Sequence, residues 1–201
     1  GRSPMWHLTT LVFAFAPKQH PPLGGRRMSP CMGAPSANDW NDEVKVAWAQ
    51  AYASVDGEHE YEITEIDGTL PPDIHGTVFR NGPANFERGG RRFEHVLDGD
   101  GLLCRFSMDG RRGRVHFKSC FVRTPAFEAE EAADAVLYRS TFGTQPKGQI
   151  TNLGKLSIKN VANTNVQSWG GQLLALFEAA LPCRIEPASL RYEGPETFDN
   201  L

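Results

Sequence analysis

The residue best placed to take part in chemistry in this chain of 201 residues is Glu178. It directly follows the most apolar run of the sequence, Leu173–Phe177. A glutamate in this position has two interpretations. Either the chain leaves a buried strand for water at this point, or the carboxylate faces inward and accepts a hydrogen bond from a metal-bound imidazole. The position alone favours the first interpretation.

The six histidines show no spacing typical of a metal site, because no two of them form a short ligand pair. A hydrogen-bonded or solvated side chain is therefore the better interpretation of each one. They are His7, His20, His59, His75, His95 and His116.

The segment Asp98–Gly101 reads Asp-Gly-Asp-Gly, which is how a calcium-binding loop begins. Leu102 and Leu103 then stand where polar ligands are needed, so a calcium loop is excluded. Asp98 and Asp100 are also candidates for an acid–base pair. The glycines beside them favour a tight turn instead.

The four cysteines form no Cys-x-x-Cys pair, which excludes zinc-ribbon and thioredoxin-like sites. They are Cys31, Cys104, Cys120 and Cys183. The last three lie in apolar, strand-like surroundings, where a reduced cysteine acts as a small hydrophobic residue. A reducing compartment is the simpler interpretation. The sequence also lacks the motifs of nucleotide-binding loops, serine hydrolases and zinc proteases.

Short apolar runs alternate with glycine-rich turn signals from Tyr61 onward, which is typical of antiparallel hairpins. In the run Arg114–Val122, apolar side chains alternate with mixed ones, so one face of this strand is expected to be buried. The predicted strands are Thr77–Arg80, Leu102–Met108, Arg114–Val122, Val161–Val166 and Gln172–Glu178. Together they predict an all-β sandwich, barrel or propeller.

Two helices are predicted among these strands. Trp40, Val44, Trp48 and Tyr52 recur every four residues, which predicts a helix over residues 39–54. Residues 127–138 are rich in alanine and glutamate and predict the second helix.

The charge of the chain changes at Asn38. Residues 1–38 contain four basic residues and no acidic one, whereas all 24 acidic residues follow. A net charge of -3 gives no electrostatic reason to expect nucleic acid as a partner. The leader has one apolar run, Leu8–Ala16, which is too short to cross a bilayer. Its Ala-Phe-Ala-Pro sequence resembles the two-part plastid presequence of algae with secondary plastids. A plastid location is expected, with an unstructured tail on a cytoplasmic protein as the alternative.

Taken together, the turns and strands resemble the N-terminal part of the carotenoid oxygenase family over about residues 61–201. Each matching block is weak alone, but their order is specific. The blocks are Gly76–Pro83, His95–Gly101, Phe121–Thr124, Phe142–Thr144, Lys159–Thr164, Leu174–Glu178 and Leu190–Leu201. The family comprises the carotenoid and apocarotenoid cleavage dioxygenases, the retinal pigment epithelium isomerase and the lignostilbene dioxygenases.

The resemblance implies a seven-bladed β-propeller with non-haem Fe(II) on its axis, bound by four histidines. Such an enzyme uses O2 to split one double bond of a carotenoid or apocarotenoid into two carbonyl products. None of the six histidines matches a ligand position, and the ligands are expected beyond Leu201. This chain alone is therefore expected to bind no iron and to be inactive. At about 40–50 residues per blade, it supplies two or three blades.

The resemblance also reverses the interpretation of Glu178. This residue matches the family's carboxylate that accepts a hydrogen bond from an iron-binding histidine, with Phe177 in place of the usual tryptophan. The other matching residues are expected to be structural. Asn81-Gly82-Pro83 and Asp98-Gly99-Asp100-Gly101 are expected to fix hairpin turns, and Arg80 and Arg123 to tie loops together. The membrane-contacting patch of some relatives corresponds to Gln145–Lys159, which is only weakly apolar here.

The expected organisation is thus a disordered leader over residues 1–38, a short helical segment over 39–60 and the blades over 61–201. The alternative to an oxygenase is a non-catalytic propeller module, or a degenerate gene product that kept the blades and lost the metal.

Overall fold

The computed structural model describes residues 42–44, 46–47, 52–146 and 158–198, and the chain divides into two units, Gly1–Glu43 and Val44–Leu201. The leader predicted for residues 1–38 lies outside the described residues. Within the helix predicted over 39–54, residues 42–44 and 46–47 are helical, whereas residues 52–54 are not. The helix therefore ends earlier than its apolar spacing predicted.

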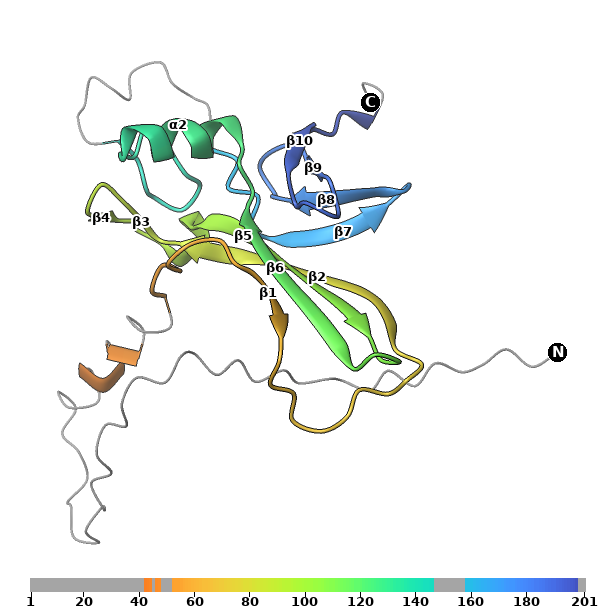
Figure 1. The fold of residues 1–201 in the computed structure, drawn as a ribbon. Helices are drawn as coiled ribbons and strands as arrows, with labels where there is room; N and C mark the ends of the chain where they lie inside the picture. The colour runs from red at the N-terminus through yellow and green to blue at the C-terminus, as the bar shows by residue number, and fades with distance from the viewer. Residues whose placement is uncertain (1–41, 45, 48–51, 147–157, 199–201) are drawn as a thin grey trace, which may run out of the picture. The chain divides into compact units, whose positions relative to one another are not determined.

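Four antiparallel strands form the first sheet, in the order β1-β6-β5-β2 (Figure 1). They are β1 (Glu60–Ile63), β2 (His75–Asn85), β5 (Asp100–Asp109) and β6 (Arg114–Phe121). In β6 every second residue, from Val115 to Phe121, is buried and the residues between are half-buried. The alternation predicted for this strand is confirmed, and it turns one face of the sheet towards a core.

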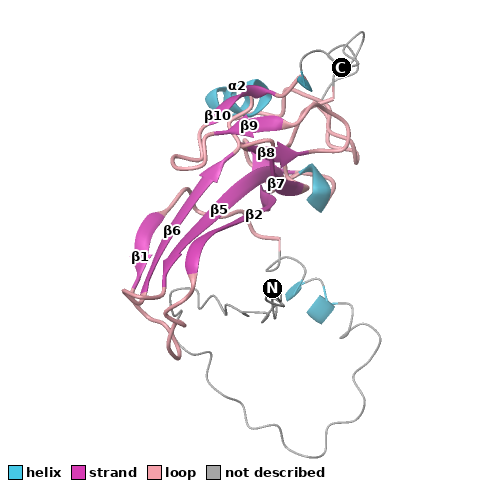
Figure 2. Cartoon of the chain, turned by 90° about the vertical axis from the view of Figure 1, so that its right-hand side faces the viewer, coloured by secondary structure: helices cyan, strands magenta, loops and turns pink. Residues whose placement is uncertain are grey.

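The second sheet is an antiparallel meander in the order β10-β9-β8-β7. Its strands are β7 (Asn165–Trp169), β8 (Gln172–Leu176), β9 (Cys183–Ile185) and β10 (Tyr192–Pro195). A four-stranded antiparallel sheet is the repeating unit, or blade, of a β-propeller. Figure 2 shows the two sheets side by side without closure into a ring. The all-β class and the partial propeller are confirmed, and the described residues supply two blades.

Shorter elements lie between the strands. A ribbon of β3 (Glu87–Arg88) and β4 (Arg91–Arg92) and the 3-10 helix η1 (Val96–Asp98) lie between β2 and β5. Helix α2 (Pro125–Ala133) follows β6. The predicted strand 161–166 was wrong over its first four residues, because Ala162 has a left-handed backbone (φ 46°) and β7 begins only at Asn165.

Helix α2 is also shorter than the predicted 127–138. Thr124 caps its start by accepting a hydrogen bond from the Phe127 N–H (3.2 Å), and Asp134 ends it in a left-handed conformation. The N–H groups of Leu137 and Tyr138 then donate to the Glu130 carboxylate at 2.9 and 3.0 Å. The side chain of Glu130 thus replaces the hydrogen bonds that a longer helix would make.

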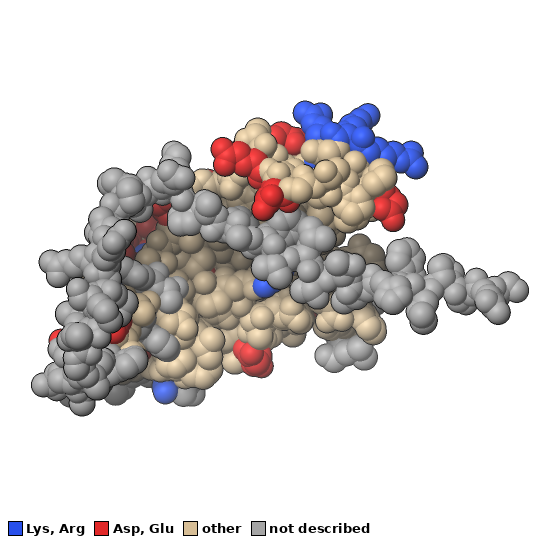
Figure 3. All heavy atoms as spheres, turned by 90° about the horizontal axis from the view of Figure 1, so that it is seen from below, with Lys and Arg blue, Asp and Glu red and all other residues tan. Residues whose placement is uncertain are grey.

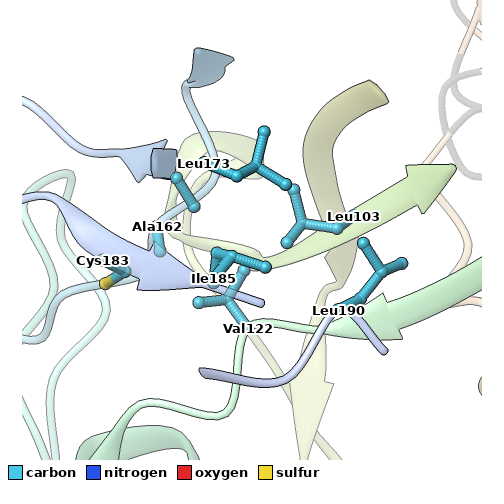
Figure 4. Close-up of a cluster of buried hydrophobic side chains, with 8 residues drawn as sticks. Leu103, Val122, Ala162, Leu173, Cys183, Ile185 and Leu190 are labelled. Carbon is cyan, nitrogen blue, oxygen red and sulfur yellow. The ribbon is translucent and has the colours of Figure 1, made fainter. Parts of the chain in front are cut away.

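The main hydrophobic core lies between the two blades (Figure 4). Leu103 and Val122 come from the first blade's side, and the remaining members come from the second blade and the segments that flank its strands. Those members are Ala162, Leu173, Ala175, Cys183, Ile185 and Leu190. Burying such side chains contributes roughly 25 cal/mol per Å² of apolar surface, so this core is the principal attraction between the blades.

The described cysteines, Cys104, Cys120 and Cys183, are free thiols that pack as small apolar side chains. Burial raises the pKa of Cys120 and of Cys183 to about 11, and the neighbouring Glu58 carboxylate adds to the shift at Cys120. These thiols are therefore protonated and weakly nucleophilic near neutral pH.

A buried network of charges joins the first blade, helix α2 and the segment that leads to β7. Lys159 forms ion pairs with Asp100 and with Glu130, the latter at 2.7 Å, and all three side chains are at most 3% exposed. Arg88 adds a second positive charge 3.0 Å from Asp100. Two cations and two carboxylates balance one another, as buried charges require.

Both predicted hairpin turns were wrong. Asn81-Gly82-Pro83 lies inside β2, where it pairs with residues 101–103 of β5. Asp98-Gly99-Asp100-Gly101 joins η1 to β5, and its aspartates are buried. Gly101 is required for another reason, since a Cβ there would clash with the Ala162 carbonyl oxygen. Gly101 therefore serves the close approach of two backbones, whereas a Cβ at Gly99 would meet the side chains of Phe86 and Pro83.

Replacing Lys159 by methionine is predicted to lower the free energy of unfolding by about 3–5 kcal/mol, because Asp100 and Glu130 would both lose a buried partner. The matched control is Lys118→Met, which removes the more exposed Lys118–Glu60 pair at 2.6 Å and should cost much less, because water screens its charges. Urea unfolding followed by circular dichroism measures both. Equal losses in the two variants would show that the buried network adds nothing special.

Alkylation of Cys120 and Cys183 by iodoacetamide at pH 8 is predicted to be roughly 100-fold slower in the folded chain than in the urea-unfolded chain. The raised pKa leaves little thiolate at this pH, whereas an unfolded cysteine titrates near its ordinary value. Peptide mass spectrometry after timed quenching reports each thiol, with glutathione as the reagent control. Similar rates in both states would contradict the burial of these residues.

Candidate functional site

Glu178 and Thr164 meet where the β7–β8 hairpin joins the rest of the chain. Thr164 immediately precedes β7, and its N–H donates to the Leu176 carbonyl at 3.1 Å. Its hydroxyl donates to Oε2 of Glu178 at 2.8 Å. The turn at Gly170-Gly171 fixes this meeting, because pairing Trp169 with Gln172 sets the register back along both strands.

The carboxylate of Glu178 is exposed and only half engaged. Oε2 accepts the Thr164 hydroxyl, whereas Oε1 has no hydrogen-bonding partner among the described residues. The preceding Phe177 is 7% exposed, so its burial anchors the backbone from which the carboxylate projects. An ionised carboxylate only accepts hydrogen bonds, and Oε1 is available for an N–H donor.

Thr164 was not identified as a site residue from the sequence, although the block that contains it was recognised. The available signal was the glycine pair at 170–171. Counting back from a two-residue turn places residue 164 opposite residue 177, and therefore beside Glu178.

The segment before Thr164 is held by side-chain amides. Nδ2 of Asn163 donates to the carbonyls of Leu97 at 2.9 Å and Gly99 at 2.7 Å, which ties the segment to η1. Oδ1 of Asn160 accepts the Ala162 N–H at 3.0 Å. These bonds replace strand pairing over residues 160–163.

The described histidines lie on separate elements. His59 pairs with Asp56 at 3.0 Å, His75 is exposed at the start of β2, and Nδ1 of His95 accepts the Leu97 N–H at 3.1 Å. His116 lies 3.5 Å from Glu60 and 3.3 Å from a guanidinium nitrogen of Arg105. His7 and His20 lie outside the described residues. Within the described ranges, no three His, Cys, Asp or Glu side chains lie together as a metal would require.

Asp98 and Asp100 do not form an acid–base pair. The carboxylate of Asp98 accepts the N–H groups of Phe142 at 2.9 Å and Thr144 at 3.0 Å, so it organises a loop. Asp100 belongs to the buried network of charges. Each carboxylate is committed to a structural partner.

The two arginines expected to tie loops together differ. Arg123 pairs with Glu131 of α2 at 2.7 Å and with Glu58, before β1, at 3.3 Å, so it does connect separate segments. Arg80 is exposed on β2, and its side chain makes no hydrogen bond or ion pair with the described residues.

The described surface carries charge of both signs. On the face shown in Figure 3, Lys and Arg side chains gather chiefly in one small cluster, and acidic side chains lie near it. Elsewhere on this face the described surface is mostly uncharged. In the described segments no helix is both long and apolar enough to span a bilayer.

Two surface clefts lie beside the start of α2, with volumes of about 390 and 270 Å³. Pro125 and Tyr192 line both clefts, and neither is lined by Thr164 or Glu178. They are separate from the Thr164–Glu178 pair.

Comparison with known proteins connects this geometry with one family. The model of the family described as "Retinal pigment epithelial membrane protein" matches residues 52–201. Among curated proteins, the apocarotenoid-15,15'-oxygenase of Synechocystis is 41% identical over 167 residues, covering 83% of this chain and 33% of the relative. The chloroplastic carotenoid cleavage dioxygenase 7 of Oryza sativa is 36% identical over 141 residues, covering 67% and 22%.

Solved structures agree. The cobalt-substituted Synechocystis apocarotenoid oxygenase superposes with a TM-score of 0.72 at 41% identity, over 77% of this chain and 32% of that one. The chain thus spans about a third of the length of these relatives. Solved variants of the Synechocystis enzyme include changes at a threonine, at a tryptophan and at the glutamate that directly follows it. That threonine and glutamate are 14 positions apart, the same separation as Thr164 and Glu178.

Proposed function

The chain belongs to the retinal pigment epithelial membrane protein family, the carotenoid oxygenases, and from this membership we propose that the protein containing it is a non-haem Fe(II) dioxygenase that cleaves a double bond of a carotenoid or apocarotenoid. The observation that carries the proposal is the 41% identity with the Synechocystis apocarotenoid oxygenase over most of this chain, together with the matching fold. Because the chain spans a third of such relatives, the activity belongs to the complete protein.

The role of Glu178 follows from its two oxygens. Thr164 fixes Oε2, and Oε1 remains available to accept the N–H of an imidazole whose other nitrogen binds iron. The donor chemistry of the described residues fits this supporting role. The iron ligands themselves are assigned to histidines outside these 201 residues. When bound, ferrous iron supplies the centre at which O2 and the polyene react, and the double bond yields two carbonyl products.

The contribution of these blades to catalysis is therefore orientation. A carboxylate that accepts an imidazole N–H selects one tautomer of the ring and fixes its plane. The 14-position spacing that Thr164 and Glu178 share with two residues altered in the Synechocystis variants supports this pairing. A plastid location is proposed on the character of the leader and on the chloroplastic relative.

Reading the coding sequence downstream of Leu201 separates this function from a non-catalytic module. The proposal expects a His-Pro soon after Leu201 and three further histidines in strand-like contexts. A genuine stop codon in the transcript directly after Leu201 would favour a chain without the metal.

The 201-residue chain by itself is predicted to bind no stoichiometric Fe(II) and to leave an apocarotenal uncleaved, because its described residues hold no metal-binding cluster. Anaerobic iron titration and chromatography of the reaction products measure both. A polypeptide of the relatives' full length is the positive control. Turnover by the short chain would overturn the assignment of the ligands to residues outside it.

In the complete protein, Glu178→Gln is predicted to weaken iron retention by roughly 10- to 100-fold, because a neutral amide supports an iron-binding imidazole less well than a carboxylate. Iron content after dialysis against a chelator measures the effect. Glu193→Gln, which changes an exposed glutamate of β10 in the same blade, is the control and should retain iron normally. An unchanged iron content in Glu178→Gln would remove this residue from the site.

A further inference from the structure

The side chain of Asn81, in β2 of the first blade, forms hydrogen bonds with the backbone on both sides of Thr164. Its Nδ2 donates to the carbonyl of Ala162 at 2.8 Å and to the carbonyl of Asn165 at 2.9 Å. The first carbonyl lies two residues before Thr164 and the second one residue after it. One amide group of the first blade therefore fixes the backbone on both sides of the threonine.

The orientation of this amide is determined by its partners. Two carbonyl oxygens accept hydrogen bonds and cannot donate them, so only the NH2 group of Asn81 can face them. An oxygen in the same place would meet two acceptors and be repelled. The contact therefore requires a donor with two hydrogens at this position of β2.

The backbone that Asn81 holds is strained and closely packed. Ala162 is fully buried with φ of 46°, a left-handed conformation that is unfavourable for alanine. The N–H of Gly101 donates to the Val161 carbonyl at 2.9 Å, and the lack of a side chain on Gly101 permits this approach. Such a conformation persists only where surrounding contacts enforce it, and Asn81 supplies one of them.

The strained segment ends at the threonine that engages Glu178. The Glu178 side chain is exposed, and the Thr164 hydroxyl is its one hydrogen-bonding partner in the described part of the chain. The direction of that hydroxyl depends on the backbone of residues 162–165. The backbone of residues 162–165 therefore links the hydrogen bonds of Asn81, in the first blade, to the bond between Thr164 and the Glu178 carboxylate.

We propose that Asn81 is a positioning residue of this site, which holds the 162–165 backbone so that the Thr164 hydroxyl fixes the Glu178 carboxylate. The proposal rests on the function proposed for Glu178, and it adds a contribution from the first blade. Asn81 acts through Thr164 and touches neither substrate nor metal.

The first experiment measures hydrogen–deuterium exchange of residues 160–168 in the metal-free complete protein. Asn81→Ala should speed exchange of the Thr164 amide, which donates to Leu176, by about tenfold as the segment opens locally. The control is Thr77→Ala, a truncation to alanine in the same strand, which removes an exposed bond to Ser107 (3.3 Å) inside the first blade instead. It should leave residues 160–168 unchanged. If Asn81→Ala does not fold, Asn81→Ser, which keeps one donor, takes its place. Exchange that is unchanged by the Asn81 variant overturns the proposal.

The second experiment reads the site without turnover, through the visible spectrum and chelator resistance of the Co(II)-loaded complete protein. The cobalt-substituted Synechocystis structure indicates that such loading is feasible in this family. Asn81→Ala and Thr164→Val should shift the spectrum alike and lower metal retention several-fold. The double variant should be no worse than Thr164→Val, because both changes break one path. Thr77→Ala should leave the spectrum unchanged.

The outcomes separate the two proposals. Additive effects of Asn81→Ala and Thr164→Val would show that Asn81 does not act through Thr164, which overturns this inference. A different result is faster exchange at residues 160–168 in Asn81→Ala together with normal Co(II) retention in Thr164→Val and in Glu178→Gln. It would show that Asn81 does hold the 162–165 backbone. In that case the function proposed for Glu178 fails.

Discussion

The arrangement of the two blades depends on the buried ion pairs of Lys159. Its ammonium group lies between Asp100, at the start of β5, and Glu130, on helix α2, and all three groups are removed from water. Isolated buried charges are costly, so the favourable state requires every partner in place. Apolar packing between the blades supplies attraction but little direction. The ion pairs and the hydrogen bonds to Glu130 are directional, and they fix where the chain enters the second blade.

The segment from Lys159 to Thr164 connects these ion pairs to the hydrogen bond between Thr164 and Glu178. Over six residues it forms no strand, because its polar side chains bond to backbone groups and Ala162 is left-handed. Asn160 satisfies the Ala162 N–H, and Asn163 reaches η1. Each bond removes a freedom that an irregular segment would otherwise keep. The backbone before Thr164 is therefore held in one conformation, which directs the Thr164 hydroxyl towards Glu178, although residues 159–164 belong to no helix or strand.

Strands with a local sequence pattern were predicted correctly. The roles of residues whose contacts lie far away in the sequence were not. Alternation in β6 and the glycine pair before β8 identified their strands, since both signals arise within a few residues. Asn81-Gly82-Pro83 was predicted as a turn, yet β2 is an edge strand with a bulge after Pro83, where proline is tolerated. Gly101 serves a backbone that follows 60 residues later, at Val161. The role of Glu178 was inferred only through family resemblance, because its position alone favoured an exit to water and the register of the Gly170-Gly171 hairpin, which places Thr164 beside it, was not counted.

Glu178 is exposed, yet this is compatible with the proposed role in an iron site, because one carboxylate oxygen is fixed by Thr164 and the other is available to a ligand. A carboxylate that orients a ligand needs one oxygen fixed by its own scaffold and one free for the ligand. Thr164 provides the first condition, and the lack of a described partner at Oε1 provides the second. A fully solvated glutamate would have no reason to meet a threonine held by strained backbone and by an amide from another sheet. The order that these contacts impose on residues 162–165 is thus the strongest physical argument that the carboxylate is placed for use.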